Sequence, residues 1–232
     1  MLYLIGLGLD DGDISIRGIE AVKKCDEAFA ETYTSQWAGN LSAIEKATGK
    51  RVQTLSREGV ESDFLVNMAK KQKVALLVPG DPLSATTHFQ LVIDAKKAGI
   101  KCEIIHSSSI ITSVAETGLH LYKFGRTTTL PKDFKAESPF EAIEKNKKTG
   151  LHTLILLDVG MDLKEALETV GKKIGTGEKI IACLSLGTDG QIIKYGTANE
   201  LKGYFKQITS PSCIIIPGEL NFKEEEALEL WK

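Results

Sequence analysis

The chain carries no excess of basic residues. Its 29 lysines and arginines are slightly outnumbered by 31 aspartates and glutamates, and the formal net charge is −2. Proteins that hold nucleic acid through its phosphate backbone normally carry a surplus of positive charge. We therefore expect no nucleic-acid partner, unless a local basic patch supplies the missing charge.

Long apolar runs and paired cysteines are also missing. No apolar segment reaches the ~20 residues that a membrane-spanning helix needs, and residues 1–6 lack the basic start of a signal peptide. The cysteines are widely spaced, and none belongs to a CxxC pair, which argues against a structural zinc site or a dense disulfide framework. They are Cys25, Cys102, Cys183 and Cys213. We expect a cytoplasmic protein with no membrane contact, no bound metal and free, buried thiols.

Motifs of three common enzyme classes are absent. The sequence contains no GxxxxGK[ST] phosphate loop, no GxSxG nucleophile turn and no HExxH zinc motif. The histidines do not stand beside an acid or a cysteine in a pattern that predicts nucleophilic catalysis. They are His88, His106, His120 and His152. We interpret them as structural histidines, and no catalytic residue is predicted.

The first half of the chain alternates short apolar runs with longer amphipathic runs, as in parallel strands joined by crossover helices. Strands are expected over residues 2–7, 28–33, 52–55, 74–78 and 102–105. Ser15 is expected to cap a helix whose inward stripe is Ile16, Ile19 and Val22. Further helices are expected over 41–48, 63–73 (with Phe64, Leu65 and Met68 inward) and 84–98.

The second half has a looser pattern that predicts a mixed sheet. Strands are expected over 153–159, 180–186, 191–195 and 213–216, and helices over 163–174 and 198–205. The short connection 187–190 predicts a hairpin, and 127–138 is the best candidate for an irregular loop. The predicted fold is therefore α/β with two domains. A parallel sheet is expected in residues 1–108 and a mixed sheet in residues 109–232.

Ligands of open α/β sheets bind beyond the carboxyl ends of strands, and the first such end resembles a dinucleotide-binding turn. Residues 6–13 nearly match that fingerprint, although Asp11 occupies the place of the third glycine. Glu31 lies about where a ribose-binding acid would stand. However, Asp10, Asp11 and Asp13 would repel a pyrophosphate. Two interpretations stay open: a cofactor without phosphate, or a tight turn with solvated acids.

Two further strand ends carry polar residues. After the apolar run 74–78 comes a Pro-Gly-Asp-Pro turn, where Asp81 could accept hydrogen bonds from an ammonium or hydroxyl group of a ligand. The alternative is that Asp81 only caps the following helix. The third end, 105–110, offers serines and free backbone groups that suit a small polar ligand.

Several segments together resemble the diphthine synthases, which belong to the wider class of tetrapyrrole methylases. They are Leu2–Leu9, Glu31–Ser35, Ser56–Glu58, Pro79–His88, Ile105–Ile110, Gly118–Gly125 and Gly150–Val159. The Gly-Asp-Pro turn is shared by the wider class. The Ala-Thr-Thr-His run 85–88 and the Leu-Tyr-Lys-Phe-Gly run 121–125 are narrower and point to the diphthine synthases.

The resemblance implies an S-adenosylmethionine-dependent methyltransferase with two α/β domains, its cofactor in the cleft between them, usually in a homodimer. The implied substrate is a modified histidine of translation elongation factor 2, in diphthamide biosynthesis. Methyl groups would go to the amino nitrogen of its 3-amino-3-carboxypropyl arm, leaving S-adenosylhomocysteine. Archaeal enzymes are expected to stop at the trimethylated product, whereas eukaryotic relatives also form a methyl ester.

The resemblance also implies cofactor-binding positions, several of which act through the backbone. They are Leu9, Asp81, Ser84, Ser109, Ile110, Leu157, Leu186 and Ser212. Ser212 stands where the family has a histidine, which puts one adenine or ribose contact in doubt. The stretch 159–179 looks shortened. The loop 127–138 and the stretch 122–124 are expected to form the rim that contacts the elongation factor.

Two other functions stay open. A related methylase of a tetrapyrrole or another small molecule would favour arginines around a pocket for a large planar acid. Arginines are few here: Arg17, Arg51, Arg57 and Arg126. The other alternative is a non-catalytic cofactor-binding or scaffold protein. Because methyl transfer is an in-line displacement that depends on alignment more than on a strong base, a missing catalytic dyad does not argue against an enzyme.

Overall fold

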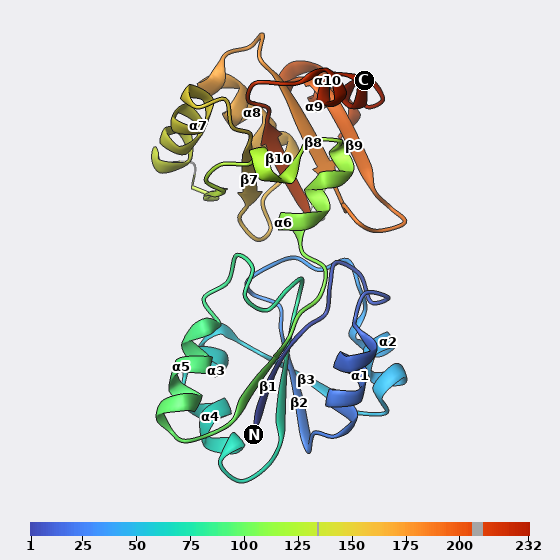
Figure 1. Cartoon of the computed structure of the whole chain (residues 1–232), viewed down its shortest axis with the longest axis vertical. Helices are drawn as coiled ribbons and strands as arrows, with labels where there is room; N and C mark the ends of the chain where they lie inside the picture. Colours follow the sequence, from blue (N-terminus) through green and yellow to red (C-terminus); the bar gives the residue numbers. More distant parts are fainter. Residues whose placement is uncertain (134, 206–210) are drawn as a thin grey trace. The chain divides into compact units, whose positions relative to one another are not determined.

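The computed structural model describes residues 1–133, 135–205 and 211–232. The chain divides into two compact units, Met1–Ile111 (unit 1) and Thr112–Lys232 (unit 2), and each is described by itself (Figure 1). Each unit is built on a five-stranded sheet. Among the described residues, no helix combines the length and the hydropathy needed to cross a membrane.

Unit 1 contains a parallel sheet in the order β3-β2-β4-β1-β5. Its strands are β1 (Leu2–Gly6), β2 (Glu27–Glu31), β3 (Val52–Leu55), β4 (Val74–Val78) and β5 (Cys102–Ile105). All the pairings are parallel, and Leu4 at the centre of β1 lies between Leu76 of β4 and Ile104 of β5. The predicted parallel α/β sheet is confirmed.

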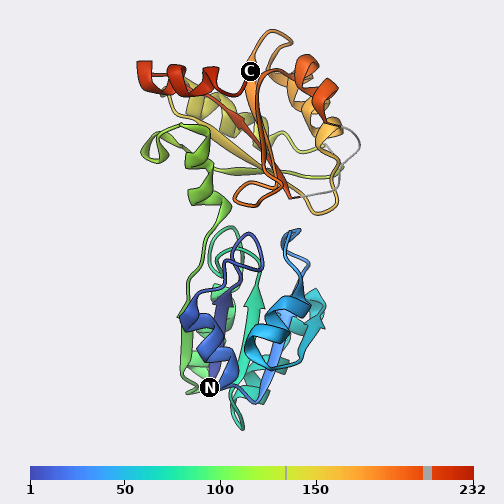
Figure 2. The same ribbon diagram turned by 90° about the vertical axis from the view of Figure 1, so that its right-hand side faces the viewer.

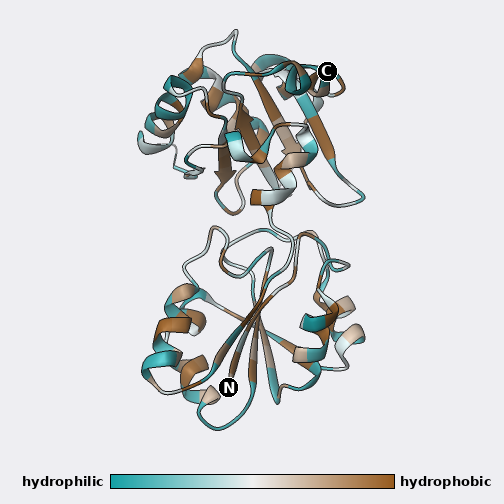
Figure 3. Cartoon of the chain, in the orientation of Figure 1, coloured by the Kyte–Doolittle hydropathy of each residue, from teal (hydrophilic) through white to brown (hydrophobic). Residues whose placement is uncertain are grey.

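Helices cover both faces of this sheet (Figure 1). Residues of α1 (Ile16–Lys23) and α2 (Leu41–Thr48) share one buried cluster with Ile5 and Leu7. Residues of α3, α4 and α5 share another with Leu2 and Leu4. These helices span Arg57–Glu61, Phe64–Ala69 and Phe89–Lys97. The side chains of β1 therefore alternate between two cores, and the strands of this sheet are largely brown in Figure 3.

Three details of the predicted helices in unit 1 are wrong. The helix expected from residue 84 begins at Phe89, because Ala85 adopts a left-handed φ of 57° that a helix cannot contain. Ile16 is 82% exposed and does not belong to the inward stripe of α1. Phe64 is 42% exposed rather than inward, although its ring packs edge-on against that of Phe29 with 5.5 Å between the ring centroids.

Unit 2 contains the mixed sheet, in the order β6-β7-β10-β8-β9. Its strands are β6 (Thr128–Leu130), β7 (Thr153–Leu157), β8 (Lys179–Leu184), β9 (Ile192–Thr197) and β10 (Ser212–Ile216). β6 pairs with β7 in parallel, and the other pairings are antiparallel. The predicted mixed sheet and the predicted β8–β9 hairpin are confirmed.

The helices α7 (Ser138–Lys148), α8 (Leu163–Ile174) and α9 (Ala198–Tyr204) share a buried cluster with one face of this sheet. The helix α10 (Phe222–Glu229) lies on the side away from α9 (Figure 2). The chain enters the unit through α6 (Ile110–Ser113) and two short 3-10 turns, Val114–Thr117 and Leu121–Lys123. α10 packs tightly on this segment, because a Cβ at Gly118 would lie 2.2 Å from that of Ala227.

The segment 127–138 is not the irregular loop that the sequence predicts. Thr128–Leu130 forms β6, and Ser138 begins α7, which the sequence analysis also missed. Residue 134 of this segment lies outside the described residues. The thiols are all free: Cys25, Cys183 and Cys213 are buried, and Cys102 is half-buried.

Candidate functional site

The carboxyl ends of β4, β1 and β5 are neighbours in the sheet, so the loops that follow them meet at one edge of unit 1. The loops after β1 and β4 are joined by a reciprocal backbone pair. The amide of Gly8 donates to the carbonyl of Gly80 at 3.1 Å, and the amide of Gly80 donates back at 2.8 Å. Both glycines have a left-handed φ, of 76° and 69°. This edge is called the carboxyl edge below.

Close packing of the turns explains the glycines of the near-fingerprint. A Cβ on Gly6 would lie 2.7 Å from the carbonyl oxygen of Gly80, and one on Gly8 would lie 2.1 Å from the Cβ of Asp13. Neither distance is tolerable for a real side chain. The glycines are therefore required by the contacts of the turn with its own neighbours.

Asp13 is turned inward and ties the turn after β1 to the loop after β5. Its Oδ2 accepts hydrogen bonds from the amide of Leu9 at 2.9 Å and from the hydroxyl of Ser108 at 2.5 Å. The hydroxyl of Ser107 donates to the backbone carbonyl of Asp13 at 2.9 Å. This acid is therefore structural, and it adds negative charge to the edge.

Asp81 joins the loops after β4 and β5, and its side chain is almost fully buried. Oδ1 accepts from the amide of Leu83 at 3.0 Å and from the hydroxyl of Ser84 at 3.3 Å. Oδ2 accepts from the amide of Ser107 at 3.3 Å and lies 2.7 Å from Nδ1 of His106. Since α5 begins only at Phe89, the alternative that Asp81 caps the helix is wrong.

The charge of Asp81 is stabilised by these partners. Burial alone would raise the pKa of the carboxyl group. Hydrogen bonds from the amide of Leu83, from His106 and from the amide of Ser107 outweigh burial and hold the pKa below its ordinary value. Asp81 is therefore a carboxylate at neutral pH.

His106 lies at the carboxyl edge and pairs with Asp81, a contact that the sequence does not predict. The His106 side chain is 67% exposed and that of Asp81 is 9% exposed, so the imidazole faces solvent while its carboxylate partner is buried. The two residues are 25 positions apart, and β1 separates their strands in the sheet. The two residues meet only because of the conformation of their loops, so no local sequence pattern predicts the pair.

The predicted cofactor positions of unit 1 all lie on the loops of the carboxyl edge or directly after them. They are Leu9, Asp81, Ser84, Ser109 and Ile110. Ser84 is bound to Asp81, and the hydroxyl of Ser109 accepts from the amide of Ile111 at 3.2 Å. The structure therefore collects these five residues, predicted from separate segments, at one side of the first sheet.

The predicted cofactor positions of unit 2 also share an edge of their sheet. Leu157 is the last residue of β7, Ser212 is the first of antiparallel β10, and Leu186 follows β8. The register places Ser212 beside Leu184 and Cys213 beside Leu156. These positions therefore cluster within unit 2, and the cofactor cleft between the domains stays a prediction.

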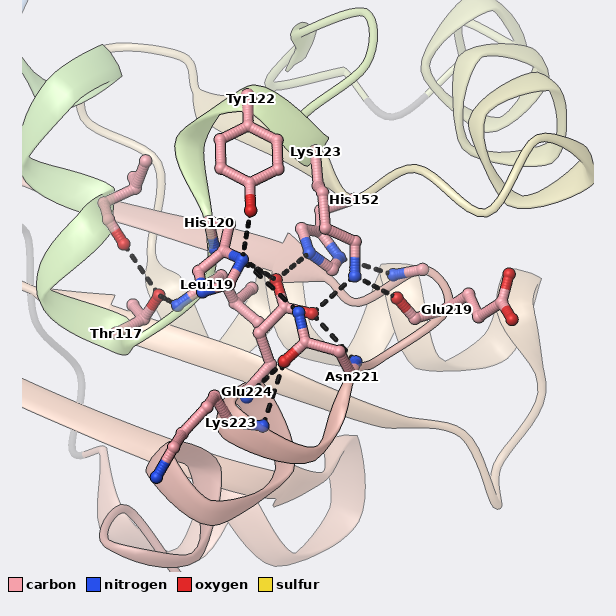
Figure 4. A network of polar contacts seen from close by, with 12 residues as sticks. Thr117, Leu119, His120, Tyr122, Lys123, His152, Glu219, Asn221, Lys223 and Glu224 are labelled. Carbon is pink, nitrogen blue, oxygen red and sulfur yellow. Dashed lines mark hydrogen bonds and ion pairs between the residues drawn. The ribbon is translucent and has the colours of Figure 1, made fainter.

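Unit 2 contains a second polar network, centred on the fully buried Glu224 of α10 (Figure 4). Its carboxylate accepts from the amides of His120 and Asn221, each at 3.0 Å, and from the ammonium group of Lys123. His152 Nε2 completes the set at 3.0 Å. Burial would raise the pKa of Glu224, but Lys123, the two amides and His152 lower it from 4.5 to about 2.

Of the two histidines in this network, His152 is structural, as the sequence predicts. Nδ1 of His152 accepts from the amide of Gly218 at 2.8 Å, so Nε2 carries the proton that it donates to Glu224. Burial lowers the pKa of His152, which keeps the ring neutral. Lys123 also donates to the carbonyl of Glu219 and is held inside the network, whereas Tyr122 is 81% exposed with its hydroxyl 2.8 Å from His120 Nδ1.

His88 is also buried, with its Nε2 3.9 Å from a carboxylate oxygen of Glu31. Burial lowers its pKa. Within the part of the chain that the structure describes, no group of three or more His, Cys, Asp or Glu side chains is arranged to hold a metal ion.

Comparisons with known proteins cover the whole chain. Residues 1–202 match the family model of Tetrapyrrole (Corrin/Porphyrin) Methylases. A diphthine synthase of Methanocaldococcus jannaschii is 38% identical over 253 residues, covering 99% of this chain and 98% of the relative. A diphthine synthase of Methanosarcina mazei is 39% identical over 254 residues, covering 98% and 94%.

A solved structure gives the same result. The crystal structure of a diphthine synthase superposes with a TM-score of 0.93 at 34% sequence identity, covering 99% of this chain and 95% of that chain. A family match over most of the sequence, full-length relatives and a shared fold therefore agree. The chain belongs to the diphthine synthases within the tetrapyrrole methylase family.

Proposed function

We propose that this chain is an S-adenosylmethionine-dependent methyltransferase of diphthamide biosynthesis. Its substrate is translation elongation factor 2, on which it methylates the amino group of the 3-amino-3-carboxypropyl-histidine to form diphthine. The observation that carries the proposal is the full-length similarity to diphthine synthases, at 38% and 39% identity. We place the enzyme in the cytoplasm, with its protein substrate.

The carboxyl edge fits the cofactor by charge. S-adenosylmethionine supplies a methyl group activated by a sulfonium cation, and it carries no phosphate. The loops of this edge carry Asp10, Asp11 and Asp13 after β1 and Asp81 after β4, and residues 1–15 contain no lysine or arginine. Such an edge suits a cationic ligand and opposes a pyrophosphate.

Particular residues of each unit would hold the cofactor. From unit 1 they are Leu9, Asp81, Ser84, Ser109 and Ile110, and from unit 2 Leu157, Leu186 and Ser212. Asp81 contributes mainly as a positioning residue, because its carboxylate already accepts bonds from Leu83, Ser84, Ser107 and His106. Backbone groups of the loops that it fixes are then the direct contacts.

The substrate must present an amine at the end of an arm. A bare imidazole ends several bonds short of that position, and a misplacement of about 1 Å lowers a displacement rate about a hundredfold. A long, thin arm can enter a site while the folded body of the factor stays outside. The exposed Tyr122 is a candidate contact for that body, together with described parts of the segment 127–138.

The test is to offer modified and unmodified elongation factor 2 side by side with methyl-labelled cofactor. We expect label only in the factor that already carries the aminocarboxypropyl arm. Equal labelling of both factors would contradict the proposed substrate. Labelling of neither factor while a free tetrapyrrole is methylated would identify a small-molecule methylase, and cofactor binding without any methylation would indicate a scaffold protein.

A further inference from the structure

We propose that His106, held by Asp81, is the catalytic base that removes the proton from the substrate amine. The inference rests on the proposed function, and it assigns a residue to a step that the sequence leaves without one. At neutral pH the amino group of the arm is an ammonium ion, which has no lone pair to attack a methyl group. One proton must therefore leave the nitrogen for each methyl group that it receives.

The geometry of the pair fixes which nitrogen of His106 can act. Nδ1 lies 2.7 Å from Oδ2 of Asp81, and Asp81 is a carboxylate that can only accept. Nδ1 therefore carries the proton and donates it to Asp81. The lone pair of the neutral ring is then on Nε2, at the edge of the imidazole that faces away from the carboxylate.

Nε2 of His106 is available to a ligand. The side chain is 67% exposed, and no hydrogen bond joins Nε2 to any residue in the described ranges 1–133, 135–205 and 211–232. His152 provides the contrast, because both of its nitrogens are bound within the protein and its side chain is fully buried. Each of the two histidines contacts a carboxylate, but only His106 has a ring nitrogen that is not hydrogen-bonded to a described residue.

The surroundings hold the ring in place. The amides of Leu83 and Ser107 fix the orientation of the Asp81 carboxylate, and this carboxylate in turn fixes the orientation of the His106 ring. The segment after β1 contributes the titratable groups Asp10, Asp11 and Asp13, and the segment after β4 contributes Asp81 and His88. Asp13 is bound to Ser107 and Ser108, next to His106.

The proton balance of the step is simple. Nε2 accepts a proton from the ammonium group, and the electrons of the broken N–H bond become the nitrogen lone pair. That lone pair forms the new bond to the methyl carbon, while the electron pair of the breaking carbon–sulfur bond stays with the sulfur. The imidazolium ion, paired with Asp81, then releases its proton to water through its exposed edge.

The competing explanation is that His106 only keeps Asp81 in place. His106→Asn separates the two roles, because the asparagine amide can still donate to Asp81 from the position of Nδ1 but cannot accept a proton. Lys101→Gln is the matched control, since Lys101 is an exposed residue that immediately precedes β5, at the end opposite His106.

The variants are compared in three measurements with the full-length protein. Calorimetric titration with S-adenosylhomocysteine should give similar affinities for all. Methylation of the modified factor at pH 7 should fall about a hundredfold or more in His106→Asn and stay unchanged in Lys101→Gln. The deficit should close as the pH rises to about 10, where amines of this kind lose the proton to water, and added imidazole should restore part of the rate.

Each outcome decides the matter. A wild-type rate at pH 7 in His106→Asn, or a deficit that is the same at every pH and is not relieved by imidazole, would overturn the base assignment while leaving the methyltransferase proposal intact. Nitrogen NMR of the wild-type histidines gives a readout that needs no substrate. It should find the Nδ1–H tautomer at His106, and an Nε2–H tautomer would overturn the inference even if no factor is methylated.

Discussion

At the scale of single residues, Asp81 concentrates the most interactions of the carboxyl edge. Replacing it with alanine leaves the amides of Leu83 and Ser107 and the Nδ1–H of His106 without their acceptor. An unsatisfied buried donor costs about 1–3 kcal/mol, so Asp81→Ala should lower the free energy of unfolding by about 3 kcal/mol. The loss of loop positioning should also weaken S-adenosylhomocysteine binding by about tenfold or more.

Urea unfolding and calorimetric titration measure these two effects separately. Glu20→Ala is the control, because Glu20 is an exposed acid of the same unit that forms a surface ion pair with Lys23, three positions along α1. It should leave both quantities unchanged. A variant Asp81→Ala with wild-type affinity and wild-type stability would show that the carboxylate does not hold these loops.

The acids of the first turn make a second prediction at this scale. Asp10, Asp11 and Asp13 follow β1 where a dinucleotide-binding protein would place its pyrophosphate, and Asp13 is fixed there by Leu9 and Ser108. Neither NAD nor NADP should therefore bind. Titration with each at micromolar concentration should give no saturable signal, and saturable binding would contradict the charge argument.

The site could be predicted only in part from the sequence. The three turns of the carboxyl edge could be predicted because each follows an apolar strand, which is local information, whereas most individual cofactor positions were implied only by the resemblance to diphthine synthases. The pairing of His106 with Asp81 could not be predicted, because it depends on β4 and β5 flanking β1 and on the conformation of two loops. The prediction that Lys123 contacts the substrate overlooked its buried partner Glu224, which lies about a hundred positions further along the chain.

At the scale of elements, α10 is attached to its unit through Glu224. The folded protein lowers the pKa of this group from 4.5 to about 2, so the stabilisation is complete above pH 4.5 and is lost as the pH falls towards 2. At about 1.4 kcal/mol for each tenfold change in proton affinity, the lowering corresponds to about 3 kcal/mol. Wild-type stability should therefore decline by this order on acidification.

Glu224→Gln tests whether Glu224 causes this loss of stability at low pH. The amide removes the charge that faces Lys123 and the buried His152, so the variant should be less stable at pH 7 by about 3 kcal/mol. Its unfolding free energy should then change less between pH 5 and pH 3 than that of the wild type. Urea unfolding across this range measures both values, with the adjacent exposed Glu225→Gln as control. Parallel pH curves for Glu224→Gln and the wild type would contradict the assignment.

The elements that the sequence predicted best are those whose pattern is set by burial alone. β4 is apolar at every position because both faces are covered, and β1 alternates between two cores. Other elements depend on backbone details that no apolar pattern records. The start of α5 is set by the left-handed Ala85, and β6 has only three residues, too few for a periodicity.

At the scale of the whole molecule, we expect a homodimer. The prediction rests on the resemblance to diphthine synthases, which are usually dimeric, and composition alone does not divide apolar surface between core and interface. Sedimentation at micromolar concentration should give a species of twice the chain mass of 25.3 kDa. A stable species at the mass of one chain would contradict it.

The function of the molecule as a whole is decided by one measurement. Wild-type protein and S-adenosylmethionine are incubated with elongation factor 2 that carries the 3-amino-3-carboxypropyl arm. The mass of the peptide that contains the modified histidine is then measured by mass spectrometry. A gain of one or more methyl groups on the amino nitrogen of that arm is the predicted result, with no gain in the factor that lacks the arm. An unchanged mass of the armed peptide, with cofactor bound and the protein folded, would contradict the function proposed here.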